Sequence, residues 1–170
     1  MLTYDAARRI TSRPAPRRPL YPDWRREIER PAQREVSIAT VPLIEVDAAS
    51  PQVRAVFDDI RTTRNTDFIN NFWRALANHP ATLKRTWESV KEVMAPGALD
   101  PATKELIYLA VSISNGCVYC TASHGAAAKR LGMSPEMLGE LIAVVGMANE
   151  TNRLADGYRV PVDERFENLF

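Results

Sequence analysis

Apolar residues recur at helical spacing along most of the chain from about residue 48 onward. The first run lies between Val53 and Ile60, and Ser50-Pro51 before it predicts an N-cap followed by a first-turn proline. Further helices are predicted over 68–77, after His79-Pro80 with an apolar stripe from Leu83 to Met94, from Pro101 toward Asn115, over 117–131 and from Pro135 through Ala148. The pattern therefore predicts an all-α fold, a compact bundle of about six helices, with at most one short strand at 40–45.

The first 35 residues differ from the rest in composition. They hold nine arginines, five acidic residues and five prolines. Proline at this density prevents a long helix and favours extended chain. We therefore expect residues 1–35 to form a basic N-terminal arm or loose extension, and residues 36–170 to form the helical domain. A natural translation start near Val36 is an alternative interpretation of the same boundary.

Net charge and hydropathy argue against several classes of function. The formal charge of +1 gives no general attraction to nucleic acid. No apolar run approaches the roughly 20 residues of a membrane span, and the first thirty residues lack the apolar stretch of a secretory signal. These features predict a cytoplasmic protein with no nucleic-acid or membrane partner. Because the cytoplasm keeps thiols reduced, a catalytic cysteine pair is favoured over a structural disulfide.

The two cysteines of the chain, Cys117 and Cys120, are separated by two intervening residues, and His124 follows one helical turn later. On a helix these three side chains share one face. Glu105 lies twelve positions before Cys117 and interrupts an otherwise apolar run, so it is placed to orient His124 if the two helices fold back on each other. A cysteine pair at this spacing with a titratable base beside it predicts a redox-active site.

The local chemistry leaves open which sulfur attacks first. Cys117 falls at the start of its helix, where the partial positive charge lowers the pKa of a thiol. His124 is one turn from Cys120 but two turns from Cys117, so distance favours Cys120 as the thiol that gives up its proton to the imidazole.

The spacing Glu105-x11-Cys117-x2-Cys120-x3-His124 resembles the signature of the alkylhydroperoxidase D-like branch of the carboxymuconolactone decarboxylase family. Residues 71–76, 78–80 and 103–106 are similar to the same branch. The resemblance implies an all-α fold that assembles into homo-oligomers, often trimers or multiples of them. It also implies that Cys120 attacks the peroxide, that Cys117 resolves the product and faces the partner, and that His124 and Glu105 belong to a proton relay.

The activity that this resemblance implies is the reduction of hydroperoxides by thiols, without a metal or an organic cofactor. The oxidised pair would be recycled by a dithiol protein, either thioredoxin-like or lipoyl-bearing. Some proteins of the family instead reduce a partner peroxiredoxin. The lactone decarboxylases of the family generally lack the cysteine pair, so decarboxylation is disfavoured for this chain.

Three alternatives share these residues. Two thiolates, an imidazole and a carboxylate could bind zinc, although structural zinc sites more often draw ligands from two separate knuckles. A non-enzymatic redox sensor or oligomer-forming helical protein would use the same cysteine pair without turnover. In the third alternative the cysteines are buried and inert. Of the remaining residues, Trp73 and Trp87 are expected in the core or an interface, His79 at a helix boundary, and Tyr119 in packing or substrate access.

Overall fold

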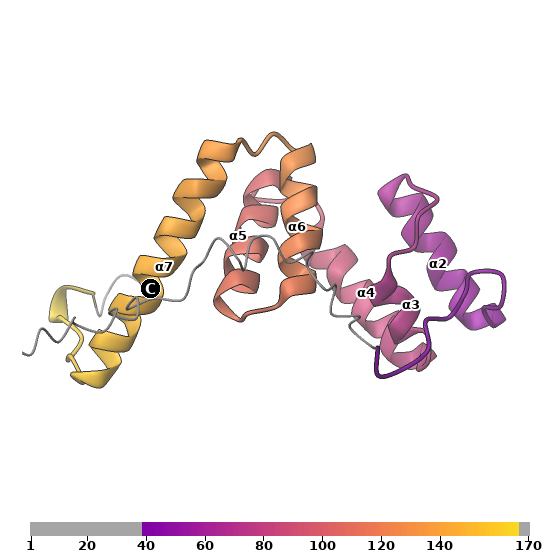
Figure 1. Cartoon of the computed structure of the whole chain (residues 1–170), viewed down its shortest axis with the longest axis horizontal. Coiled ribbons are helices and arrows are strands. Elements are labelled where there is room, and N and C mark those ends of the chain that lie inside the picture. Colours follow the sequence, from indigo (N-terminus) through magenta and orange to yellow (C-terminus); the bar gives the residue numbers. More distant parts are fainter. Residues whose placement is uncertain (1–38, 167–170) are drawn as a thin grey trace, which may run out of the picture. The chain divides into compact units, whose positions relative to one another are not determined.

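The computed structural model describes residues 39–166 of the chain. The predicted arm at 1–35 and the alternative start near Val36 lie outside these residues. Within them the protein is all-helical, with six α-helices, one short 3₁₀ helix and no strand (Figure 1). The elements are α2 (Pro51–Arg64), α3 (Asn71–Leu76), α4 (Pro80–Met94), α5 (Pro101–Ser114), α6 (Val118–Arg130), α7 (Pro135–Gly157) and η1 (Glu164–Phe166). The predicted all-α class is confirmed.

The starts of the helices follow the capping signals in the sequence. Ser50, Asp100 and Ser134 are N-caps whose side chains accept a hydrogen bond from the backbone N–H three residues on, and a proline follows each. His79 has the same role at α4, where its ring accepts from the N–H of Thr82, so the prediction of a structural boundary residue is confirmed.

Helices α2, α3 and α4 share one apolar core. Phe57, Ile60 and Leu83 are almost completely buried, and the indoles of Trp73 and Trp87 meet edge to face with their centroids 5.4 Å apart. Edge-to-face contact is a favoured geometry for aromatic rings, and each such ring removes a large apolar area from water. The predicted core positions of both tryptophans are therefore confirmed.

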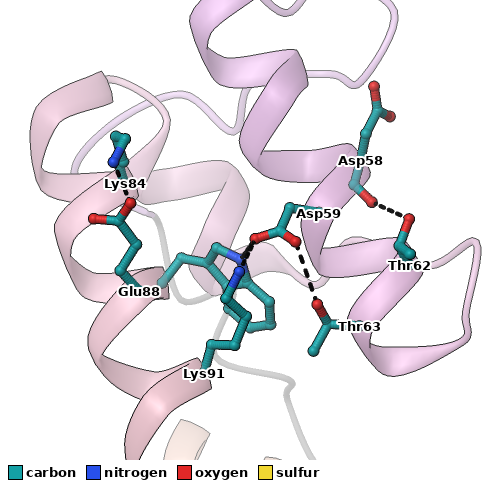
Figure 2. A network of polar contacts seen from close by, with 8 residues as sticks. Asp58, Asp59, Thr62, Thr63, Lys84, Glu88 and Lys91 are labelled. Atoms are coloured by element: carbon teal, nitrogen blue, oxygen red, sulfur yellow. Dashed lines mark hydrogen bonds and ion pairs between the residues drawn. The ribbon is translucent and has the colours of Figure 1, made fainter.

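A carboxylate on α2 joins this core to the surface of α4. Asp59 Oδ2 accepts hydrogen bonds of 2.6 Å from both Trp87 Nε1 and Lys91 Nζ, and Asp59 Oδ1 accepts one from Thr63 (Figure 2). The hydrogen bond from Lys91, and then the one from Trp87, lower the pKa of Asp59 below its ordinary value. The contact satisfies the one polar atom of a buried indole.

Two local predictions are wrong. The helix expected over 68–77 begins only at Asn71, because the Asn70 side chain caps it and leaves Phe68 71% exposed before the first turn. No strand forms at 40–45. That segment is instead held against α3 by Arg74, whose backbone carbonyl accepts from the N–H of Ile44 and whose Nε donates to the Ile44 carbonyl.

Helices α5, α6 and α7 form the other packed group, in which α5 contacts both α6 and α7. Leu109 of α5, Ala128 of α6 and Val145 of α7 are its buried apolar residues, and many other apolar side chains of these helices remain exposed. Lys104 ties the start of α5 to the end of α4, because its ammonium donates to the backbone carbonyls of Val93 and Ala95. None of the helices described here is both long and apolar enough to cross a membrane.

Candidate active site

A tight turn between α5 and α6 places the cysteine motif. Asn115 ends α5, and Gly116 has φ 68°, a left-handed conformation that glycine adopts without steric cost. The N–H of Cys117 then donates to the carbonyl of Ser112 at 3.0 Å. The turn reverses the chain, so α6 runs back along α5.

Cys117 is the N-cap of α6, and its sulfur accepts a 3.2 Å hydrogen bond from the N–H of Cys120. The predicted start of the helix at this motif is therefore confirmed. The two cysteines are joined in a disulfide, with their Cα atoms 5.3 Å apart. The pair can thus bond within one helical turn, as a reversible redox pair requires.

The histidine and the glutamate meet across the two helices. Nδ1 of His124, on α6, lies 2.7 Å from Oε2 of Glu105, on α5, and both side chains are 17% exposed. An ionised carboxylate only accepts hydrogen bonds, so opposite such a partner Nδ1 is the donor, and an imidazole in this tautomer has its lone pair on Nε2. This is the arrangement of a base held in one tautomer by an acidic partner.

Sequence reasoning missed one residue of this site. The ring of Tyr108 stacks on the imidazole of His124, with centroids 3.5 Å apart and planes inclined by 15°. Tyr108 lies three residues after Glu105 on α5, so both side chains project from the same face. That spacing was the available signal, but without the pairing of α5 with α6 it was indistinguishable from an ordinary apolar position.

A largely apolar cavity of about 370 Å³ opens beside the cysteine pair. Its walls include Val93, Met94, Ile107, Tyr108 and Val111 together with both cysteines. Cys117 and Cys120 are thus accessible from a cavity large enough for a small organic molecule.

Two further side chains border the site, Tyr119 on α6 itself and Arg64 at the end of α2. The hydroxyl oxygen of Tyr119, between the cysteines, accepts a 3.1 Å hydrogen bond from the N–H of Phe72, which gives Tyr119 a packing role. The guanidinium of Arg64 lies 5.2 Å from the centre of the Trp87 ring and 5.5 Å from that of Trp73. Desolvation lowers the pKa of Arg64, although the residue as a whole is exposed, and the negative charge of Glu105 partly opposes the shift.

The structure gives no support to the zinc hypothesis within the described residues. Among residues 39–166, no group of three or more histidine, cysteine, aspartate or glutamate side chains is arranged to hold a metal ion.

The fold has counterparts among known proteins. Residues 80–163 match the model of the carboxymuconolactone decarboxylase family. A crystal structure titled alkylhydroperoxidase AhpD core, from Rhodospirillum rubrum ATCC 11170, is similar to this chain at 55% sequence identity and a TM-score of 0.73. The match covers 76% of this chain and 97% of that one. No curated protein sequence matches. The chain belongs to the AhpD-like branch of the carboxymuconolactone decarboxylase family.

Proposed function

We propose that this protein is a thiol-dependent peroxidase that reduces hydroperoxides with Cys120 and Cys117 and is recycled by a dithiol protein. The observation that carries the proposal is the disulfide-capable pair at the start of α6, which lies beside an open cavity. His124 of the same helix is hydrogen-bonded to Glu105 of α5. The printed name of the similar Rhodospirillum rubrum structure, an alkylhydroperoxidase, supports the same class of activity.

The proposed cycle begins with the reduced pair. The thiolate of Cys120 attacks the peroxide, and an S–O bond forms as the O–O bond breaks. The departing alkoxide, or hydroxide from hydrogen peroxide, takes the proton that His124 had accepted from the thiol. The sulfenic acid on Cys120 then condenses with the thiol of Cys117, which gives the disulfide and one water. A partner dithiol reduces this disulfide through a mixed disulfide and is itself oxidised.

The His124–Glu105 pair supplies the proton chemistry of this cycle. With Nδ1 committed to Glu105, Nε2 is the nitrogen that can accept the proton of Cys120, one turn away on α6. The reductant of the disulfide is proposed to be a thioredoxin-like or lipoyl-bearing protein of the cytoplasm. In the variant in which the reduced pair passes its electrons to a partner, that partner is an oxidised peroxiredoxin, which takes the place of the peroxide.

The exposed apolar surface of α5 and α7 supports a homo-oligomer. Val144, Met147 and Leu154 are each about half exposed, and their spacings of three and seven place them on one face of α7. An apolar stripe on a single helix is typical of a surface that packs against another chain. A trimer or a multiple of trimers is the assembly proposed.

Peroxide consumption with a small dithiol donor, dihydrolipoamide, tests the proposal. Wild type should turn over hydrogen peroxide or cumene hydroperoxide, and Cys120→Ser should abolish turnover. Cys117→Ser should allow one oxidation without recycling, and His124→Ala should slow the reaction by about a hundredfold, the lower part of the range for general-base catalysis. Equal consumption by all four proteins would refute the assignment. A single oxidation of wild type without turnover would favour the redox-sensor alternative.

A further inference from the structure

Tyr108 stands out among the residues near the cysteine pair because it touches two parts of the site. One face of its ring lies 3.5 Å, centroid to centroid, from the imidazole of His124. The same side chain lines the cavity onto which Cys117 and Cys120 open. It is 37% exposed, so burial in the core does not explain its position.

The hydrogen bond to Glu105 cannot by itself fix the imidazole. It anchors one ring atom, Nδ1, and the χ2 angle of histidine has a broad energy well, so a ring held at one edge can still tilt. A flat aromatic surface at 15° to the ring plane removes this freedom. Helix α5 therefore holds His124 twice, by its edge through Glu105 and by its face through Tyr108.

We infer that Tyr108 is a positioning residue for the base, one that keeps His124 in the tautomer and orientation that leave Nε2 free to accept a proton. The inference rests on the function proposed above, because the base is useful only if Cys120 reacts. The ring face and not the hydroxyl carries this role, since the contact is a stack between the two rings.

The two histidines of the chain provide an internal comparison for the test. His79 caps α4, and its Nδ1 accepts a hydrogen bond from the N–H of Thr82, so its neutral ring carries the proton on Nε2. His124 faces a carboxylate with Nδ1 and carries the proton there. Nitrogen-15 NMR of the ring nitrogens at mildly alkaline pH should therefore show two opposite tautomers, and His79 reports whether a variant is folded.

Three variants distinguish the effect of the Tyr108 ring from the effect of its hydroxyl and from the general effect of replacing a tyrosine. Tyr108→Phe should keep the wild-type kcat and the wild-type tautomer of His124. Tyr108→Leu should lower kcat about tenfold and mix the tautomers of His124, because small misplacements of a catalytic group are costly. Tyr158→Leu, at a 79% exposed tyrosine, should change neither. If Tyr108→Leu does not show the His79 signal of the folded protein, Tyr108→Met replaces it.

The outcomes distinguish this inference from the proposed function. The positioning role would be refuted if Tyr108→Leu kept the wild-type kcat and the wild-type tautomer of His124. It would also be refuted if Tyr108→Phe were as impaired as Tyr108→Leu, because the hydroxyl would then be responsible. If wild type itself consumes no peroxide, the proposed function fails, and the His124 tautomer in the three variants still decides whether Tyr108 positions the ring.

Discussion

Helices α2–α4 bury more apolar side chains than helices α5–α7 do. Most of the buried apolar residues belong to the first group or to the segment before it, and they include both tryptophans at its centre. The second group has few buried apolar residues, although its helices are apolar along much of their length. The first group is stabilised by its own core, whereas the second holds the candidate site residues and leaves apolar surface exposed.

The difference indicates that helices α2–α4 contribute mainly stability, whereas helices α5 and α6 carry the candidate site. Trp73, Trp87 and Leu83 contribute stability but lie on helices that carry no residue of the redox pair. Cys117, His124 and their partners lie on α5 and α6, where the packing leaves a cavity. Substitutions in the first group should therefore act on folding, and substitutions in the second on chemistry or assembly.

The largest effect on stability is expected at the centre of the first core. Leu83→Ala removes a completely buried side chain and should lower the free energy of unfolding by about 2–5 kcal/mol. Leu99→Ala, at a half-exposed position outside that core, is the matched control and should change it far less. Urea denaturation measures both, and equal losses in the two variants would contradict the proposed division.

A charge on the exposed face of α7 tests the assembly of the second group. Val144→Lys should weaken the homo-oligomer about tenfold or more, because a charged side chain in an apolar contact is left unpaired. Arg85→Glu changes charge on an exposed residue of α4 and should leave assembly unchanged. Sedimentation over a range of concentrations gives the mass of each protein. A monomeric wild type, or unchanged assembly of Val144→Lys, would contradict the proposal.

The smallest effect is expected at the carboxylate that links α2 to α4. The folded pKa of Asp59 is lowered, so its contribution to stability is present above the unfolded pKa and is lost as pH falls through the folded one. Asp59→Asn should therefore reduce stability at pH 7 and make less difference at about pH 3. Because Asp59 and Lys91 are each 41% exposed, the loss should not exceed about 1 kcal/mol. Thermal unfolding at both pH values measures it, and a loss that grows toward low pH would contradict the assignment.

Local signals in the sequence predicted most of the helix starts. Ser50-Pro51, Asp100-Pro101 and Ser134-Pro135 each combine a capping side chain with a residue preorganised for the first turn, so little depends on the rest of the fold. The start of α3 was predicted three residues early because Phe68 and Ile69 continue the apolar spacing, whereas the Asn70 cap determines where the helix begins.

Within the candidate site, the resemblance named the four residues, and the structure places Glu105 against His124 and Cys117 against Cys120. The stacking of Tyr108 on His124 could not be predicted, because it depends on the rotation of α5 about its axis relative to α6. The expected strand at 40–45 failed for a similar reason. Its backbone groups pair with Arg74, thirty residues away, and no local pattern records such a partner.

The sulfur of Cys117 is both an N-cap and a member of the redox pair. A thiolate accepts hydrogen bonds more strongly than a disulfide sulfur does, so each round of oxidation weakens the bond that the Cys120 amide donates. If the pair cycles as proposed, we expect the first turn of α6 to loosen on oxidation and to tighten on reduction. The rate of hydrogen exchange at the Cys120 amide would therefore report the oxidation state of the cysteine pair without any added substrate.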